Sequence, residues 1–292
     1  MASPPRRLPH VSASRLRWLR AGLGVLQAVS SSLAARVAFR LFLTPSRRRL
    51  DAGDAAALLR ARVHRLPCGD GQIQVYEWGD GPRTVVILHG WGSHAPRFVP
   101  MVEALVAAGW RVLAPDAPGH GKSTGRLSSL PQFITALDAI GVRFGPLDAA
   151  IGHSLGALAI ALWLSDPARD ATRKPHKAVL ISAPPGAPFL IDAFHDMLGI
   201  RPATRIRMAE LFHRRFGAEP DRFSCLPGAA GVGVPVLLVH DRQDDVVPIG
   251  HSTELNLRIP QSLLHATDGL GHSGLLRDTG TIERIKGFLG SH

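Results

Sequence analysis

Short apolar runs alternate with longer stretches of helical periodicity from about residue 63 onward. The runs are rich in Val and Ile, which is typical of strands buried on both faces of a parallel sheet. They comprise Thr84–Leu88, Val112–Pro115, Ala149–Ile151, Ala178–Ser182, Val236–His240 and Leu263–Ala266. The helix-length stretches comprise Phe98–Ala108, Gln132–Arg143, Leu155–Leu164 and Leu275–Leu289. This alternation predicts an α/β fold in which helices cover both faces of a mostly parallel central sheet.

The alternation is interrupted at two places. Residues 63–67 and 72–78 alternate apolar and polar side chains on either side of a turn at residues 69–71, which predicts a β-hairpin at the start of the domain. Residues 185–231 lie between two predicted core strands and form a longer segment than a connection requires. We therefore expect residues 185–231 to form a small helical cap inserted into the fold.

The predicted cap contains many large apolar side chains. Their helical spacing favours a role in the cap's own core over a role as the lining of an acyl pocket, but the sequence is compatible with both. These residues are Phe189, Phe194, Met197, Leu198, Met208, Leu211, Phe212 and Phe216.

The N-terminal segment has a different character from the domain. Over residues 16–43 most leucines and valines recur at steps of three, four or seven, which predicts an amphipathic helix. Four arginines divide this stretch, so no apolar run reaches the roughly 20 residues needed to cross a membrane. Pro45 ends the helix, and residues 45–60 are expected to be a hinge. We thus divide the chain into a basic arm, residues 1–55, and an α/β domain, residues 56–292.

The net charge of +11 is concentrated in the arm. Residues 1–50 contain ten arginines and no aspartate, glutamate or lysine, whereas the remainder of the chain carries all 23 acidic residues and is nearly neutral. We therefore expect no nucleic-acid partner, and any basic partner surface belongs to the arm.

Three placements of the arm are compatible with its sequence. Its apolar face could dock on the domain, or the arm could lie on an anionic membrane with its arginines beside the lipid headgroups. A secretory signal built on Ala21–Ala35 is the third placement, and it is weakened by Gln27 and by the serines at 30–32. We expect a cytoplasmic protein, with peripheral contact between residues 1–50 and the inner face of the membrane left open.

The sequence gives no indication of a metal or cofactor. The two cysteines, Cys68 and Cys225, cannot form a disulfide scaffold, and no CxxC motif or Cys/His cluster indicates a zinc site. Residues 121–123 read Gly-Lys-Ser, as in a nucleotide phosphate loop, but Asp116 stands where that motif needs a glycine. We expect neither a metal ion nor an organic cofactor.

A candidate nucleophile follows the predicted strand Ala149–Ile151 directly. Residues 152–156 read Gly-His-Ser-Leu-Gly and lead into a helical run. A sharp strand-to-helix turn exposes the serine hydroxyl, the two glycines leave room for close packing, and the helix N-terminus favours negative charge beside the serine. We therefore interpret Ser154 as a nucleophile rather than as an inert turn residue.

A candidate oxyanion site follows the strand Thr84–Leu88, where residues 89–92 read His-Gly-Trp-Gly. Glycines on both sides of one large residue allow its backbone N–H to face a substrate oxygen. The N–H groups of Trp91 and Leu155 would then form the pair of donors that a tetrahedral acyl intermediate requires.

A base and an acid can be sought in the C-terminal third. His272 lies in a glycine-rich segment after the last predicted strand, where a loop can bring it over the edge of the sheet. Asp241, Asp244 and Asp245 follow the strand Val236–His240, and a carboxylate at such a strand end can orient a histidine. The residues alone leave the choice among the three aspartates open.

The order Ser154, Asp244, His272 resembles that of the α/β-hydrolase superfamily over about residues 63–292. In that family the acid occupies a D-x-x-V-P turn, which the sequence contains at residues 244–248. The resemblance therefore implies Asp244 as the acid.

Three further segments carry the same resemblance. The His-Gly-Trp-Gly turn at residues 89–92 matches the family's oxyanion turn, and residues 116–123 are similar to the loop after its fourth strand. Residues 271–276 match the family's histidine segment of the form GH-x-x-L-L. One position departs from the pattern, since Asp241 stands where relatives usually carry a glycine.

The resemblance implies a carboxylesterase-like serine hydrolase that cleaves an ester or thioester through an acyl-enzyme. The substrate is expected to carry an apolar acyl or alkyl group. The serine nucleophile argues against the dehalogenase branch of the family, which uses an aspartate there. Two alternatives remain: an acyltransferase with the same acyl-enzyme, and a non-catalytic binding protein held at a membrane by residues 1–50.

Overall fold

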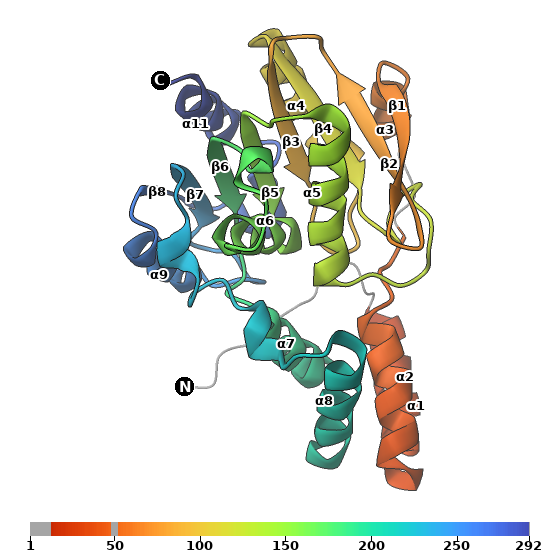
Figure 1. Cartoon of the computed structure of the whole chain (residues 1–292). Coiled ribbons are helices and arrows are strands. Elements are labelled where there is room, and N and C mark those ends of the chain that lie inside the picture. Colours follow the sequence, from red (N-terminus) through yellow and green to blue (C-terminus); the bar gives the residue numbers. More distant parts are fainter. Residues whose placement is uncertain (1–12, 48–51, 292) are drawn as a thin grey trace.

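The computed structural model describes residues 13–47 and 52–291, and within these ranges eight strands form one sheet covered by helices (Figure 1). The strand order is β1-β2-β4-β3-β5-β6-β7-β8. Strand β2 is antiparallel to β1 and β4, and all the other neighbours are parallel. The strands are β1 (Arg62–Cys68), β2 (Gly71–Trp78), β3 (Arg83–Leu88), β4 (Trp110–Asp116), β5 (Ala149–His153), β6 (Lys177–Ile181), β7 (Val236–Asp241) and β8 (Ser262–Thr267).

Helices occupy the connections between these strands, as the alternating pattern predicts. The α-helices are α1 (Ala13–Val29), α2 (Ser31–Phe42), α3 (Ala52–Leu58), α4 (Val99–Ala107), α5 (Leu130–Phe144), α6 (Leu155–Ser165), α7 (Ala187–Leu198), α8 (Pro202–Phe216), α9 (Gly250–Arg258), α10 (Gly271–Gly274) and α11 (Thr279–Gly290). The short 3-10 helices are η1 (Ala95–Phe98), η2 (Ala171–Arg173), η3 (Pro220–Phe223) and η4 (Ala229–Gly231).

Two apolar cores lie on opposite faces of the sheet. Helices α5, α6 and α9 cover one face, and α4, α10 and α11 cover the other. Because the central strands are buried on both faces, their sequences are almost continuously apolar, which is why they could be recognised without a structure. The α/β fold with a mostly parallel sheet and the β1–β2 hairpin are both confirmed.

The C-terminal helix begins later than the sequence pattern predicts. We expected one helix over residues 275–289. The chain instead forms the single turn α10, which ends at Gly274, and begins α11 at Thr279. The new start is fixed by Asp278, whose carboxylate accepts the backbone N–H of Thr281 at 2.7 Å. His272 consequently lies in α10 and not in a loop.

The segment predicted to be a hinge, residues 45–60, also contains ordered structure. Within it lies α3, and the Asp54 carboxylate of this helix is 3.7 Å from the His94 imidazole just before η1. Both side chains are buried. The part of the connection that precedes the sheet is therefore fixed to the domain.

The predicted single helix of the arm is two helices that form an antiparallel hairpin (Figure 1). They are separated at Ser30, whose backbone is extended and whose hydroxyl accepts the N–H of Leu33 at 3.2 Å. Serine is a favourable N-cap residue, so it begins a second helix more readily than it continues the first. We refer to α1 and α2 together as the N-terminal hairpin.

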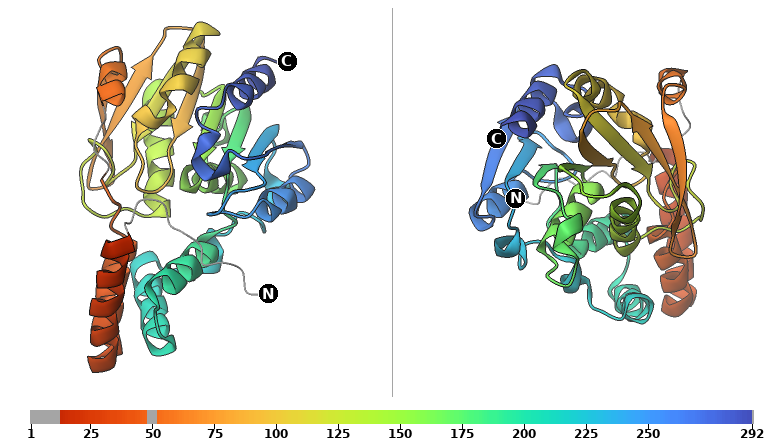
Figure 2. Two further views of the ribbon diagram at one scale, coloured as in Figure 1. Left: turned by 180° about the vertical axis from the view of Figure 1, so that it is seen from behind. Right: turned by 45° about the horizontal axis from the view of Figure 1, so that its top comes forward.

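The N-terminal hairpin docks on the cap helices α7 and α8, which is the first of the three placements that its sequence allows (Figures 1 and 2). Ala34, Ala35 and Ala38 of α2 are completely buried, because their small side chains allow close helix–helix approach. Leu23 of α1 is buried in the same cluster as Phe194 of α7. Among the described residues we find no helix that is long and apolar enough to span a bilayer.

The chain after the hairpin is attached to the α/β domain by backbone contacts. The carbonyl of Leu43 accepts the N–H of Ser128 at 2.8 Å. The Arg47 guanidinium donates to the carbonyls of Gly119 at 3.3 Å, Ser123 at 3.2 Å and Gly125 at 2.6 Å. Arg47 thus fixes the end of the arm to the loop after β4.

We expect Arg47→Ala to lower the free energy of unfolding by about 1–2 kcal/mol, because three carbonyls lose a charged donor at once. The measurement is urea denaturation. The control is Arg60→Ala, which removes an exposed arginine 3.8 Å from the exposed Glu103 and should change stability by less than about 0.5 kcal/mol. Equal effects of the two substitutions would contradict the role given to Arg47.

Candidate active site

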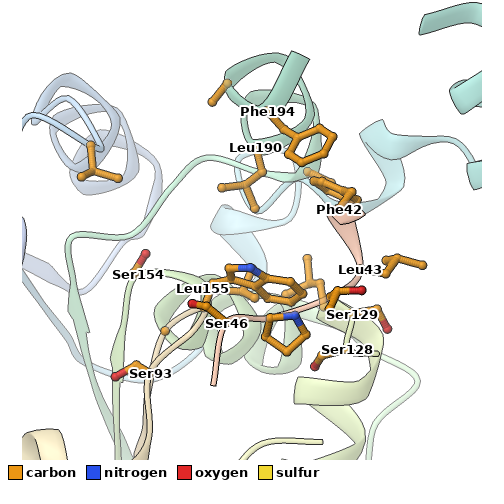
Figure 3. A pocket seen from close by; sticks show the side chains of 18 of the residues that line it. Phe42, Leu43, Ser46, Ser93, Ser128, Ser129, Ser154, Leu155, Leu190 and Phe194 are labelled. Atoms are coloured by element: carbon orange, nitrogen blue, oxygen red, sulfur yellow. The ribbon is translucent and has the colours of Figure 1, made fainter. Parts of the chain in front are cut away.

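A cavity of about 290 Å³ lies between the carboxyl edge of the sheet, the cap and the N-terminal hairpin. Ser154, His272 and Trp91 line it together with side chains from α2 and α7. Figure 3 shows Ser154 on one side of this space, with Leu190 and Phe194 of the cap and Phe42 of the hairpin around it. The cavity is thus where the sequence-predicted residues meet.

Ser154 occupies a strained turn between β5 and α6. Its φ of 53° lies in the left-handed region, which residues other than glycine rarely adopt. The turn is held by the Ser154 N–H, which donates to the carbonyl of Ile181 at 2.8 Å. This conformation directs the serine side chain away from the sheet and into the cavity.

The glycines on either side of Ser154 are required by close packing. A Cβ on Gly152 would lie 2.6 Å from the Ala157 backbone, and one on Gly156 would collide with the carbonyl oxygen of Leu88. Any side chain at these positions would force α6 away from β3 and β5. The Gly-x-Ser-x-Gly pattern is therefore explained by sterics in this chain.

Two buried histidines hold the turn at residues 89–92. The His89 Nδ1–H donates to the carbonyl of Gly90 at 2.7 Å, and His89 Nε2 accepts the Ala117 N–H at 3.0 Å. His120 Nε2 accepts the Gly92 N–H at 3.0 Å. A Cβ on Gly90 would lie 3.0 Å from the Ser154 Cβ, so the turn passes directly beside the serine.

Burial keeps these two histidines neutral, which their accepting nitrogens require. Desolvation is the largest cause in both: it lowers the pKa of His89 and lowers that of His120 to about 3. Both histidines thus serve as hydrogen-bonding supports of the loop backbone.

Asp244, in the loop after β7, and His272, in α10 after β8, are brought together at the edge of the sheet. The His272 Nδ1–H donates to Asp244 Oδ2 at 2.8 Å. Asp244 Oδ1 accepts the N–H groups of Val246 and Val247 at 2.9 and 2.8 Å, which fixes the carboxylate. With Nδ1 engaged, Nε2 is the ring nitrogen through which His272 can exchange a proton within the cavity.

A second histidine also contacts Asp244, and the sequence analysis did not identify it. His240 Nε2 lies 3.3 Å from Asp244 Oδ2 and donates to the carbonyl of Val247 at 2.7 Å, while its Nδ1 accepts from the Ser252 hydroxyl at 2.7 Å. His240 is the penultimate residue of β7, where the apolar pattern had placed it in the core. No pattern distinguished it from a packing residue.

Burial alone raises the pKa of the Asp244 carboxyl, but hydrogen bonds from His240 and His272 outweigh it. The net effect holds the Asp244 pKa far below its ordinary range. The carboxylate is therefore ionised at neutral pH, as is required of a group that orients a histidine and stabilises its protonated form.

The other two aspartates have different surroundings. Asp241 is buried and accepts from the Gln243 N–H, the Thr267 hydroxyl and the Leu270 N–H at 2.9, 2.7 and 3.0 Å. It therefore joins the loops after β7 and β8. Asp245 is exposed.

His153 packs against His272 and has no part in the proposed proton transfer. Its Nε2–H donates to the His272 carbonyl at 2.8 Å, and the two rings are 4.7 Å apart. Desolvation, followed by repulsion from His272, lowers the pKa of His153 to about 3. A neutral His153 supports the backbone of α10 and so the position of His272.

The cavity wall is mostly apolar, and part of it comes from the arm. Of the cap residues for which the sequence favoured a core role, Phe189, Phe194, Met197, Leu198, Phe212 and Phe216 line the cavity. Phe194, Met197, Leu198 and Phe212 are also buried in the cap, so both interpretations hold for them. The contribution of Leu41, Phe42 and Leu43 was not anticipated, because nothing local indicates which surface an amphipathic helix faces.

The Gly-Lys-Ser segment at residues 121–123 serves the loop structure. The Lys122 N–H donates to Asp116 Oδ2 at 2.8 Å, and the Ser123 hydroxyl donates to the Asp116 carbonyl at 2.6 Å. Asp116 also accepts the Ala95 N–H at 2.9 Å. These bonds connect the loop after β4 to η1, next to the oxyanion turn. Within residues 13–47 and 52–291 we find no cluster of ligand residues that could hold a metal ion.

Known proteins resemble the chain in sequence. The family Hydrolase_4, described as serine aminopeptidase, S33, matches residues 81–190. The chain is 28% identical over 270 residues to a 2-hydroxy-6-oxononadienedioate/2-hydroxy-6-oxononatrienedioate hydrolase of Pseudomonas putida, with 76% of this chain and 92% of that protein covered. It is also 28% identical to the pimeloyl-(acyl-carrier protein) methyl ester esterase of Aromatoleum aromaticum, with 66% and 92% covered.

Solved structures resemble the chain in fold. An esterase of Pyrococcus furiosus superimposes with a TM-score of 0.65 over 85% of this chain and 98% of its own, at 21% sequence identity. At that level of identity the likeness concerns the arrangement of strands and helices. It agrees with the sheet order and helix layers described above.

Proposed function

We propose that the chain, which belongs to the α/β-hydrolase superfamily, is a serine hydrolase that cleaves a carboxylic ester or thioester through an acyl-enzyme. The observation that carries the proposal is the convergence of Ser154 and the Asp244–His272 pair on one apolar cavity. A strained, half-buried serine that lines the same cavity as a histidine oriented by an ionised carboxylate is an arrangement that can activate a hydroxyl.

The proposed reaction has two halves. His272 Nε2 takes the Ser154 proton as Oγ attacks the carbonyl carbon, and the N–H groups of Trp91 and Leu155 hold the oxyanion. His272 then gives the proton to the leaving alcohol or thiol, and the acyl group remains on Ser154. His272 then takes a proton from water as the water oxygen attacks the acyl carbon, and it returns that proton to Ser154 Oγ as the acyl–Oγ bond breaks and the acid leaves. Asp244 stays ionised throughout and stabilises the imidazolium.

The cavity favours a small-molecule substrate with an apolar acyl or alkyl group. Its wall is formed by aromatic and aliphatic side chains from the cap and the hairpin, and serines such as Ser93, Ser128 and Ser129 lie on the side away from Leu190 and Phe194 (Figure 3). The relative that is a methyl ester esterase supports ester cleavage, and the relative that is an oxononadienedioate hydrolase supports hydrolysis in general. Neither a cofactor nor a metal has a part in the proposed steps.

The two alternatives depart from this reaction at different points. An acyltransferase would form the same acyl-enzyme and pass the acyl group to an alcohol or thiol. A non-catalytic binding protein held at a membrane would have no use for Ser154 and the Asp244–His272 pair together.

We propose a cytoplasmic location with peripheral membrane contact through residues 1–50, on the basis of the arm's charge.

We expect a fluorophosphonate probe to add once to the wild-type chain and not to Ser154→Ala, because only an activated serine attacks phosphorus at neutral pH. Turnover of a p-nitrophenyl ester should fall by about 10⁴-fold or more in the variant. The measurements are intact mass and initial rates, and circular dichroism checks that the variant folds.

Failure of well-folded wild type to form the adduct would contradict the proposal and favour the binding-protein alternative. An adduct of equal yield on Ser154→Ala would assign the nucleophile elsewhere. If the adduct forms but the acyl group appears on an added alcohol in preference to water, the protein is an acyltransferase.

We expect Asp244→Asn to lower kcat by about 10⁴-fold, because the amide cannot stabilise the imidazolium and favours the wrong tautomer of His272. The matched control is Asp245→Asn, the exposed neighbour, which should retain activity within about twofold because surface substitutions have small effects. Initial rates over a range of substrate concentrations separate kcat from KM. The reverse ranking of the two variants would overturn the assignment of Asp244.

We expect Phe42→Ala to change acyl-chain selectivity. Phe42 lines the cavity and its ring lies 5.2 Å from that of Phe194, so the truncation enlarges the space and should favour bulkier acyl groups. The ratio of kcat/KM between a long-chain and a short-chain p-nitrophenyl ester should shift by about tenfold. The control is Phe39→Ala, one turn earlier on α2, which packs on Phe216 at 6.5 Å and is outside the lining. Equal shifts in the two variants would show that α2 acts only through stability.

A further inference from the structure

We propose that the outer face of the N-terminal hairpin is a docking surface for an anionic lipid bilayer. This face is the side of α1 and α2 turned away from the cap, and it is independent of the proposed ester chemistry. Its defining residues are Trp18, Val25 and Val29 on α1 and Leu33 and Val37 on α2.

The apolar residues of α1 that face outward form one stripe. Trp18, Val25 and Val29 are 79%, 66% and 76% exposed. Their spacings of seven and four residues place them within about 40° of one another around a helix with 3.6 residues per turn. Leu23, which is buried against the cap, falls on the opposite side. α1 therefore has an inner apolar face that is covered and an outer one that is exposed.

The second helix continues the same pattern with arginines beside the apolar residues. Leu33 and Val37 are four residues apart and remain 44% and 37% exposed. Arg36 and Arg40, also four residues apart, follow them along the helix and are exposed. A row of aliphatic side chains bordered by guanidinium groups is typical of helices that lie in the interfacial region of a bilayer.

The charge of the hairpin specifies the kind of lipid. Residues 13–42 contain five arginines and no acidic residue. Arg15 lines the cavity and Arg20 donates to the cap, so the exposed Arg17, Arg36 and Arg40 are the guanidinium groups left to attract anions. Arg17 precedes Trp18 in the sequence. The guanidinium group would contact lipid headgroups, and tryptophan is enriched at membrane interfaces. The anionic phosphates of a bilayer supply both the charge and the apolar boundary that this face needs.

A second copy of the chain fits this surface less well. A symmetric dimer through α1 and α2 would set the arginines of one hairpin against those of the other, without a carboxylate in either hairpin to balance them. Exposed apolar residues bordered by one sign of charge therefore favour an anionic lipid surface over self-association.

The hairpin is hydrogen-bonded to the cap on the side opposite the proposed lipid contact, and it also lines the cavity. Arg20 Nε donates to the Met197 carbonyl at 2.6 Å, and Gln27 accepts the Arg201 N–H at 2.6 Å, which attaches α1 to the cap. On the inner face, Leu19 and Phe42 line the cavity. The hairpin thus carries the proposed lipid contact on one side and cavity-lining residues on the other, so docking would place the cavity beside the bilayer.

The test is co-sedimentation of the full chain with vesicles of phosphatidylcholine alone and of phosphatidylcholine mixed with phosphatidylglycerol. We expect binding to the mixed vesicles at low salt, and weaker binding in high salt because exposed charges are screened. The double variant Val25→Glu/Val29→Glu should bind about tenfold more weakly, because it places carboxylates on the stripe. Tryptophan emission should shift to the blue on vesicle addition in wild type and less in Trp18→Ala.

The matched control is Leu257→Glu, which introduces the same charge at an 82% exposed leucine on α9 of the α/β domain. It should bind vesicles as wild type does. All variants should keep the wild-type melting temperature and the wild-type reaction with a fluorophosphonate, so loss of lipid binding is distinguishable from loss of the site.

Three results would overturn the proposal. They are the absence of wild-type sedimentation with the mixed vesicles at low salt, equal binding by Val25→Glu/Val29→Glu and wild type, and equal binding to vesicles with and without phosphatidylglycerol. If light scattering finds a dimer that Val25→Glu/Val29→Glu converts to a monomer, while vesicles bind neither form, the outer face is a self-association surface instead.

Discussion

Ser154 has a left-handed backbone conformation between β5 and α6, and the surrounding structure maintains it at a cost of about 1–3 kcal/mol. The conformation is possible because Gly152 and Gly156 allow α6 to pass within backbone contact of β3 and β5. The same approach places the N-terminus of α6 beside the oxyanion turn at residues 89–92. The position of the proposed nucleophile, the direction of α6 and the closeness of the proposed oxyanion donors therefore depend on one steric constraint at the edge of the sheet.

Burial then decides which groups near the serine carry charge. His120 and His153 are kept neutral because desolvation lowers their pKa values to about 3, and each uses its ring to hold a loop in place. Asp244 has the opposite outcome, since donors from two histidines outweigh desolvation and keep the carboxylate ionised. Among the titratable side chains of residues 13–47 and 52–291, only His272 combines a hydrogen bond to that carboxylate with access to the cavity. The different roles proposed for these four buried groups therefore follow from their surroundings. They are His120, His153, Asp244 and His272.

The N-terminal hairpin connects the arm to the site. Its alanines pack on the cap, and Phe42 and Leu43 close one wall of the cavity. Arg47 fixes the end of the arm to the loop after β4. The hairpin is thus a structural part of the proposed substrate cavity, while its outer face remains exposed. An element with an apolar stripe on each side can pack on the protein with one and carry a second contact with the other.

The amino-acid sequence was enough to predict the α/β fold, because buried parallel strands require continuous apolar runs and the turns beside Ser154 require glycine. It also indicated Ser154, His272 and the oxyanion turn, since each comes after a strand at a position that local chemistry restricts. It left three aspartates open, and the tertiary structure distinguishes them: Asp244 contacts His272, Asp241 joins two loops, and Asp245 is exposed. The role of His240 and the wall formed by the arm were equally beyond the sequence. The role of His240 depends on contacts between side chains in the folded loop, and the wall depends on which side of a helix is covered. Periodicity along the chain shows that a helix has an apolar face, but it does not show which surface that face packs against.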